Sequence, residues 1–286
     1  MKLDFKLKED IGKLVERALK EDIGDGDLTT ELVLREEQFA QTSIIAREEG
    51  TLAGVEIAKM SFTEVDDTLQ IETLLEDGEH FNQNATIMKI KGNGSSMLKA
   101  ERVALNFLGR LSGIASLTAN FVSKVEGTDS VILDTRKTTP TLRNIEKYAV
   151  RAGGGSNHRM GLYDQILVKE NHAVWAGGLR KAVNNVIRSV GKERDFIKII
   201  VEARSKEDVK EAMVRGVDRI LLDNMSPDEV KEIRDDLPKS WTIEVSGGIT
   251  LENVRAYADA GAGYISVGML THSAKSSDFT MLMNTK

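Results

Sequence analysis

The stretch that decides the fold, Val131–His172, reads VILDTRKTTPTLRNIEKYAVRAGGGSNHRMGLYDQILVKENH. Two short apolar runs within it, Val131–Leu133 and Ile166–Val168, end abruptly in charged and polar side chains. A glycine triplet, Gly153–Gly155, lies between the two runs. Short apolar runs are typical of buried strands, and ligand pockets commonly form where parallel strands end. The stretch therefore predicts a pocket at the carboxyl ends of strands.

The charge of this stretch favours a small anionic ligand. It carries seven basic and four acidic side chains, a net charge of +3, in a chain whose net charge is -6. Nucleic-acid binding usually needs a basic face over a whole domain, so we expect no nucleic-acid partner. The alternative is a solvated basic loop, which fits less well because the bases directly follow apolar runs.

Bulk composition limits the class of protein. A chain of 286 residues predicts one large domain or two unequal domains. No apolar run approaches the ~18 residues of a membrane span, and the first residues lack the apolar core of a signal peptide. With no cysteine there is no disulfide, thiolate metal site or cysteine nucleophile. We therefore expect a cytoplasmic protein without a membrane partner.

The N-terminal part of the sequence predicts an α+β domain over residues 1–110. Apolar spacing indicates a helix over Leu7–Lys20, which the polar stretch Gly24–Thr30 breaks. The other expected elements are strands at Gln38–Glu48, Leu69–Leu75 and Ala85–Lys91, a helix at Val55–Val65, and a long bridging helix at Ser95–Val125. Gly109 and Gly113 are candidate points for a kink or division of that long helix.

The remaining residues, 111–286, predict a parallel α/β sheet or barrel, and we expect the last residues to pack back on the N-terminal domain. Repeated strand and helix patterns indicate a parallel sheet or barrel. The expected strands are Val131–Leu133, Ile166–Val168, Ile197–Val201, Ile220–Leu222, Ile243–Val245 and Tyr264–Val267. The expected helices are Leu179–Ser189, Lys206–Arg215, Pro227–Asp235 and Leu251–Ala260. Six units are fewer than eight, so either the barrel is incomplete or a further strand lies near Gly153–Arg159.

Three sets of residues at the strand ends predict chemistry. Turns formed by glycine leave backbone N–H groups available to bind phosphate. Ser246, Gly247, Gly248 and the later Gly268 fit this role, although a tight turn also needs glycine. Glu202 and Asp223 suit Mg²⁺ or ribose hydroxyls, although acids at strand ends also cap helices. The cationic set exceeds the need of one phosphate and favours a carboxylate-bearing substrate, although some members could be structural partners of acids. Its members are Arg136, Lys137, His158, Arg159 and Lys169.

In sequence the chain resembles the quinolinate phosphoribosyltransferases over nearly its whole length. The motifs, in order, are EDIGDGDLTT, AERVALNFLGRLSGIAS, LDTRKTTP, EKYAVRAGGGSNHRMGLYDQILVKENH, ILLDNMS, EVSGGIT and YISVGMLTHSA. The resemblance implies a sandwich-like N-terminal domain, an open barrel, and a homodimer with sites at its interface. It implies transfer of phosphoribosyl from phosphoribosyl pyrophosphate to quinolinate with Mg²⁺, giving nicotinate mononucleotide, pyrophosphate and CO₂ for de novo NAD synthesis.

The resemblance also assigns roles by motif. Arg102, Arg136, His158 and Arg159 are expected to hold the two carboxylates of quinolinate, with Arg102 donated across the dimer interface. Lys137 and Lys169 are expected to line the same pocket and take part in catalysis. Glu202 and Asp223 are expected to serve ribose and metal. The turn Ser246–Gly248, with Gly268 and His272, is expected to lie at the phosphates.

Two departures from the family pattern stand out. Thr141 occupies a position where the family usually has glycine, and Ala203-Arg204 follows Glu202 where the family usually alternates acids. Two other functions remain open from the sequence. One is the molybdate-operon paralogue of the same fold, acting on another substrate. The other is a barrel that binds a phosphate ligand without catalysis, since fold alone does not give function.

Overall fold

A computed structural model of the chain describes residues 5–33, 38–191 and 196–284. The chain forms two compact units. Unit 1 comprises residues up to 119, together with residues 144–154 and those from 274 onward. Unit 2 comprises residues 120–143 and 155–273.

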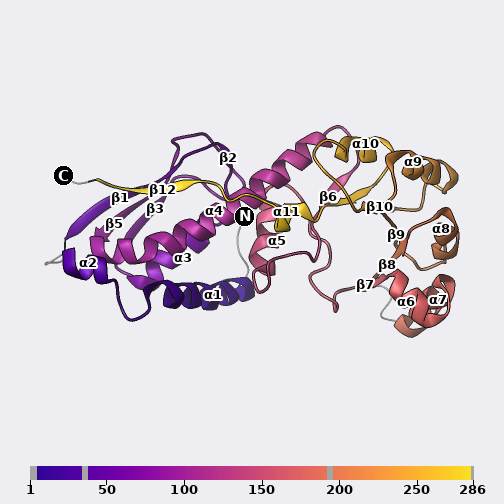
Figure 1. Ribbon diagram of the computed structural model, residues 1–286, viewed down its shortest axis with the longest axis horizontal. Helices are drawn as coiled ribbons and strands as arrows, with labels where there is room; N and C mark the ends of the chain where they lie inside the picture. The colour runs from indigo at the N-terminus through magenta and orange to yellow at the C-terminus, as the bar shows by residue number, and fades with distance from the viewer. Residues whose placement is uncertain (1–4, 34–37, 192–195, 285–286) are drawn as a thin grey trace. The chain divides into compact units, whose positions relative to one another are not determined.

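Unit 1 is built around a four-stranded antiparallel sheet. Its strand order is β12-β1-β5-β3, formed by Phe279–Asn284, Phe39–Ala46, Thr86–Asn93 and Gln70–Thr73. β12, near the end of the chain, lies along β1, with Phe279 opposite Ala46 (Figure 1). A two-stranded ribbon joins β2 (Gly50–Thr51) to β4 (His80–Phe81). The expected strands of this part are confirmed, whereas β2, β4 and β12 had no clear sequence signal.

The helices of unit 1 are α1 (Phe5–Ile23), α2 (Leu28–Val33), α3 (Val55–Val65), most of α4 (Gly94–Lys124) and nearly all of α5 (Arg143–Ala152). Of these, α3 and α4 bury apolar side chains in the core cluster of the sheet. Leu105 and Leu108 of α4, for example, join Ile44 of β1 in one buried cluster. The break expected over Gly24–Thr30 is too long, because α2 begins at Leu28 and its first turn is held by Asp27, whose Oδ1 accepts the N–H of Thr30 (3.0 Å).

The long helix α4 is a single element, so it is not divided at Gly109 or Gly113. The two glycines are instead needed for the close packing of another segment against the helix. A Cβ atom at Gly113 would lie 1.9 Å from the carbonyl oxygen of Lys275, and one at Gly109 would lie 2.7 Å from that of Ser277. The absence of side chains lets residues 275–277 cross the helix at close range before β12 begins.

Unit 2 contains a six-stranded parallel sheet, the open barrel expected from the sequence. Its strand order is β6-β11-β10-β9-β8-β7, formed by Val131–Leu133, Tyr264–Ser266, Ile243–Ser246, Arg219–Asp223, Lys198–Ala203 and Gln165–Val168. Its helices are α6 (Glu170–Ala176), α7 (Leu179–Val190), α8 (Lys206–Ala212), α9 (Pro227–Asp236), α10 (Val254–Asp259) and α11 (Met269–His272). A further pairing exists near Gly153–Arg159: Ser156 forms a parallel bridge with Leu133 of β6.

The sheet of unit 2 brings functional side chains together. Its strands are largely buried, so polar groups collect where the strands end, and parallel strands place those ends at one edge. Residues after β6 and β7 therefore lie at the same edge as those at the ends of β8–β11. Within the described ranges, no helix is long and apolar enough to cross a membrane.

Candidate active site

The carboxyl edge of the unit 2 sheet holds a pocket of about 590 Å³. Every site residue predicted within unit 2 lines it. These residues are Arg136, Lys137, His158, Arg159, Lys169, Glu202, Asp223, Ser246, Gly247, Gly248, Gly268 and His272. Five of the six strands contribute residues of their own, β6 contributes through the segment that follows it, and Leu167 and Leu221 add an apolar patch. Sequence reasoning did not name Arg204, Asn224 or Glu244 as site residues, yet all three line the pocket.

Arg136, Lys137 and Arg159 form what we call the cationic cluster. Arg136 and Lys137 follow β6, and in the described part of the chain neither has a carboxylate within salt-bridge distance. Arg159 is mostly buried and donates from Nη1 to the carbonyl oxygen of Gln165 (3.1 Å). Burial and the nearby charge of Arg136 lower the pKa of Arg159 from its usual value. Like charges held together are stabilised when an anion binds between them.

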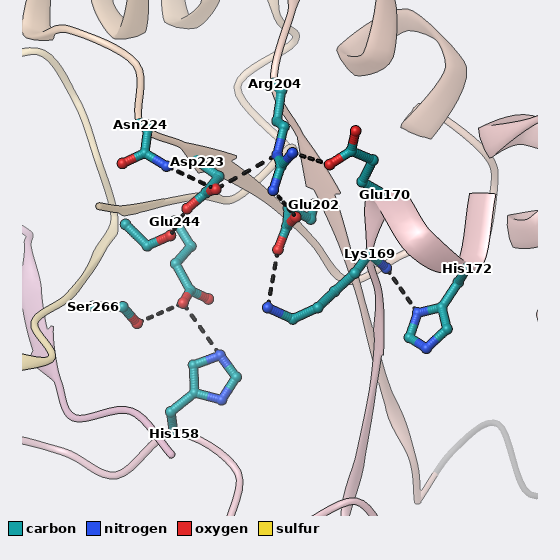
Figure 2. Close-up of polar contacts among 11 residues, drawn as sticks. His158, Lys169, Glu170, His172, Glu202, Arg204, Asp223, Asn224, Glu244 and Ser266 are labelled. Carbon is teal, nitrogen blue, oxygen red and sulfur yellow. Dashed lines mark hydrogen bonds and ion pairs between the residues drawn. The ribbon is translucent and has the colours of Figure 1, made fainter. Parts of the chain in front are cut away.

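His158 is held by the protein through both ring nitrogens. The backbone N–H of Arg159 donates to its Nδ1 (2.7 Å), so Nδ1 carries no proton in this arrangement. Its Nε2 lies 3.2 Å from Oε1 of Glu244, and this pairing requires the proton on Nε2 (Figure 2). His158 therefore presents a fixed ring edge to the pocket.

Glu244 in β10 is the buried anion beneath the pocket. Ser266 donates to its Oε1 (2.6 Å), and Nη1 of Arg219 donates to its Oε2 (2.8 Å). Burial opposes ionisation of this carboxyl, but the hydrogen bond from His158 and the charge of Arg219 outweigh that effect, so the pKa of Glu244 lies below its ordinary value. A glutamate inside the apolar run Ile243–Val245 was the available sequence signal, because buried charges need partners.

Lys169, Glu202, Arg204 and Asp223 form the ion-paired cluster. Nζ of Lys169 lies 3.2 Å from Oε2 of Glu202. Nη2 of Arg204 lies 3.5 Å from Oε1 of Glu202, and its Nε lies 3.6 Å from Oδ2 of Asp223. Figure 2 shows Arg204 between these two carboxylates, with Glu170 bound to its outer side. Glu202 lies within β8 rather than after it, and only 5% of its side chain is exposed.

The alternative that Glu202 and Asp223 cap helices is wrong. Ser205 caps α8 and accepts the N–H of Asp208 (3.1 Å), and Ser226 caps α9. The residues present do not fit a metal ion held by the protein. Both carboxylates already pair with cations, and among the described residues no three or more His, Asp or Glu side chains are grouped to hold a metal.

The glycine turn after β10 leaves backbone donors facing the pocket. Gly247 has φ 93°, and a Cβ there would lie 2.1 Å from Oδ1 of Asn224. Gly248 also has positive φ, at 62°. Within the described ranges, the N–H groups of Gly247, Gly248 and Ile249 have no backbone or side-chain acceptor. The hydroxyl of Ser246 donates to Asp223 (2.8 Å), so the backbone is the available anion donor.

Gly268 and His272 lie beside the cationic cluster. A Cβ at Gly268 would lie 3.1 Å from Nε2 of His272 and 3.2 Å from Cδ of Lys137. Glycine at this position therefore leaves room for both side chains at the pocket. Nδ1 of His272 lies 2.6 Å from the hydroxyl of Ser273. By contrast, Nδ1 of His172 accepts the N–H of Lys169 (3.0 Å), which makes His172 a helix-capping residue.

Two remaining residues of interest lie outside this pocket lining. Arg102 belongs to α4 in unit 1, where it lines a separate cavity of about 430 Å³ with Ser276, Ser277 and Asp278. Thr141 follows the cationic segment after β6 and has φ 69°. Left-handed backbone is disfavoured for a β-branched residue, which explains why glycine is the usual residue at this position of the family pattern.

These features together define a class of protein. A parallel α/β sheet with cations, paired carboxylates and a glycine turn at its carboxyl edge is the arrangement of an enzyme that acts on a phosphorylated and carboxylated substrate. Residues 114–282 match the C-terminal domain of quinolinate phosphoribosyl transferase, and residues 27–112 match its N-terminal domain. The chain belongs to the quinolinate phosphoribosyltransferase family.

Individual relatives agree with the family. A probable carboxylating nicotinate-nucleotide pyrophosphorylase from Bacillus subtilis is 42% identical over 269 residues, covering 94% of this chain and 92% of the relative. The crystal structure of NadC from Streptococcus pyogenes matches with a TM-score of 0.93 at 36% identity, covering 99% of both chains. A nicotinate-nucleotide pyrophosphorylase from Francisella tularensis matches with a TM-score of 0.92 at 35% identity, covering 99% of this chain and 98% of its own.

Proposed function

We propose that the unit 2 pocket transfers the phosphoribosyl group of phosphoribosyl pyrophosphate to quinolinate, with loss of CO₂. The products are nicotinate mononucleotide, pyrophosphate and CO₂, a step of de novo NAD synthesis. The observation that carries this proposal is the cationic cluster, in which Arg136 and Lys137 have no carboxylate within salt-bridge distance among the described residues. Beside it lies a glycine turn whose N–H groups have no acceptor in the same part of the chain. Full-length matches to this enzyme family support the same reaction.

The cationic cluster suits the two adjacent carboxylates of quinolinate. Guanidinium groups bind carboxylates through two parallel hydrogen bonds, and a lysine adds a mobile positive charge. We assign Arg136 and Arg159 to the carboxylates and Lys137 to the space between quinolinate and the leaving group. His158, fixed by Glu244, supplies one rigid edge of the same subsite.

We assign the binding of the second substrate, phosphoribosyl pyrophosphate, to the glycine turns and the ion-paired cluster. The open N–H groups at Gly247, Gly248 and Ile249 suit the 5′-phosphate, together with Gly268 and His272. The carboxylates of Glu202 and Asp223 suit the ribose hydroxyls as hydrogen-bond acceptors. Lys169 pairs with Glu202 and lies where it can also meet an incoming anion.

The chemistry then follows from alignment. The pyridine nitrogen attacks the anomeric carbon as the bond to pyrophosphate breaks, and the leaving group takes the bonding electrons. Holding two reactants in line can supply roughly 7–11 kcal/mol of the barrier. The positive ring nitrogen then stabilises the electron pair left at C2 when CO₂ departs, and C2 takes a proton. A site that excludes water assists this step, and no covalent nucleophile is required.

We further propose that the active form is a homodimer in which Arg102 reaches the site of the partner subunit. Arg102 lies in unit 1, outside the lining of the unit 2 pocket, and a two-fold dimer would use the same contact twice.

Release of labelled CO₂ tests the function. Quinolinate labelled in the 2-carboxylate should release CO₂ only when phosphoribosyl pyrophosphate is present, with equal amounts of nicotinate mononucleotide and pyrophosphate. Arg136→Ala should abolish most of the release, whereas Arg188→Ala, an exposed arginine of α7, should leave it unchanged. Binding of a phosphate ester without release would favour a non-catalytic barrel. Turnover of another acid in place of quinolinate would favour the paralogue.

A further inference from the structure

The pocket contains a cation at a position where a metal ion was expected. The guanidinium of Arg204 lies among three carboxylates, those of Glu170, Glu202 and Asp223, and lines the pocket (Figure 2). Its backbone N–H donates to Oδ2 of Asp208 (2.9 Å), which holds the chain just after β8. The five-donor fork of arginine can serve several acids at once, as it does here.

The charges around Arg204 leave little attraction for a free divalent ion. Three carboxylates face two cations, Lys169 and Arg204, so the local net charge is -1. Both oxygens of Glu202 are engaged, one by each cation. Mg²⁺ needs carboxylate oxygens in near-octahedral geometry and would have to displace a like-charged neighbour to reach them.

We propose that Arg204 takes the charge-balancing place between Glu202 and Asp223, so that the free protein does not hold a divalent cation there. Any Mg²⁺ that the reaction uses enters with the diphosphate of phosphoribosyl pyrophosphate; this second part rests on the proposed function. Arg204 thereby determines how the enzyme takes up its metal. An acid at position 204 would instead create a cluster of four carboxylates with Lys169 as the remaining cation.

Binding of Mn²⁺ to the substrate-free protein tests the first part without any assay of activity. Free Mn²⁺ is measured by electron paramagnetic resonance during titration of wild type, R204A, R204Q and R204E. We expect R204A and R204Q to bind Mn²⁺ at least tenfold more tightly than wild type, and R204E more tightly still. R204K keeps the positive charge and should bind as weakly as wild type.

Two controls show which residues are responsible for the tighter binding of Mn²⁺. R255A removes an arginine of similar exposure, 51% against 49% for Arg204, that also pairs with an acid, Asp259. R255A should not change Mn²⁺ binding. The double variant R204A/D223N should lose the gain. Thermal unfolding with and without Mn²⁺ provides a second readout, because an ion that binds the folded state raises Tm. Wild type that binds Mn²⁺ as tightly as R204A, or a gain that survives in R204A/D223N, would overturn the proposal.

The second part is measured on the reaction. In wild type the rate should follow the concentration of the complex between Mg²⁺ and phosphoribosyl pyrophosphate, and free Mg²⁺ beyond that complex should add nothing. A rate that saturates with free Mg²⁺ at fixed complex would refute this part. Absence of nicotinate mononucleotide at every Mg²⁺ concentration would refute the proposed function alone, since the Mn²⁺ titration does not depend on it.

Discussion

The two charged clusters of the pocket are prepared in opposite ways. Arg136 and Lys137 of the cationic cluster have no carboxylate within salt-bridge distance among the described residues, and the pKa of Arg159 is lowered by burial and by Arg136. In the ion-paired cluster, Glu202 and Asp223 each pair with a cation of the protein. Unneutralised charge is costly in a pocket unless a ligand completes it. The comparison teaches that the charge of the cationic cluster is left for the anionic substrate to neutralise, whereas the carboxylates of the ion-paired cluster are already paired with cations of the protein.

The largest expected effect on activity is that of removing Arg102, a cation outside the pocket lining, or Lys137 of the cationic cluster. Arg102→Ala and Lys137→Ala should each reduce kcat/KM by roughly 1000-fold, since removal of one charged partner from a desolvated site costs several kcal/mol. If Arg102 acts across the dimer, a mixed dimer has one site with both lesions and one with neither. About half of randomly exchanged dimers are mixed, so roughly a quarter of wild-type activity should return.

This complementation experiment requires proof that subunits exchange between the two variant dimers. Differently tagged subunits, purified sequentially on both tags, show whether mixed dimers have formed. Complete exchange with no return of activity would place Arg102 in the site of its own subunit. A purely monomeric protein in solution would also contradict the assignment.

Selectivity between two acids sharpens the comparison further. Nicotinate lacks the 2-carboxylate and would leave part of the cationic cluster without an anion. We expect kcat/KM for quinolinate to exceed that for nicotinate by about 100-fold, which corresponds to the cost of a charge left unpaired in the site. Steady-state rates with each acid at fixed phosphoribosyl pyrophosphate measure the ratio. Comparable values for the two acids would show that the cluster serves one carboxylate only.

Neutral variants of the ion-paired cluster separate its role from quinolinate binding. Glu202→Gln and Asp223→Asn should lower kcat by roughly 100-fold, at the lower end of the range seen when one electrostatic group of a site is removed. Quinolinate affinity by calorimetry should change less than about twofold, because the carboxylates of the substrate meet the other cluster. Loss of quinolinate binding in a folded variant would show that the two clusters are one subsite.

Glu244 links pH to stability beneath the pocket. Its pKa is lowered in the folded protein, so its contribution to stability is present above the unfolded pKa and is lost as pH falls through the folded one. At pH 7, Glu244→Gln should lower the free energy of unfolding by about 2 kcal/mol, since hydrogen bonds to a charged group are lost. Urea unfolding of both proteins at pH 7, 5 and 4 should show this difference shrinking toward acid. A difference that grows toward acid would reverse the sign we assign.

The smallest effect is expected at Thr141, in the loop that carries Arg136 and Lys137. Thr141 has φ 69° and is exposed, so Thr141→Gly should raise the free energy of unfolding by about 1 kcal/mol, because the left-handed conformation disfavours a Cβ. Tm should rise by about 2 °C. Thr141→Ala retains a Cβ and should gain less. Equal gains for both variants would show that the hydroxyl or methyl group, rather than the backbone, causes the strain.

Much of the fold could be predicted because its signals are local. The periodicity of apolar residues predicted α3 and α4 nearly to their ends, and short buried runs predicted all six strands of unit 2. The order of polar residues after those runs also predicted the pocket, since parallel strands end at one edge. By contrast, α5 and α6 were missed. Within α5, buried Glu146 pairs with Arg110, and such a partner is not visible in a local pattern.

Pairings between distant residues were decided by the tertiary structure alone. β12 becomes a strand because β1, more than two hundred residues earlier in the chain, offers an open edge, and Gly113 is explained by the carbonyl of Lys275. The sequence by itself placed the predicted residues of unit 2 at the pocket, because strand ends follow from local pattern, but it did not assign Arg204, Asn224 or Glu244 to the site. It could not determine that Arg204 lies between Glu202 and Asp223, or that Glu244 fixes His158. Those contacts depend on the register of neighbouring strands and on side-chain reach, which only the folded chain specifies.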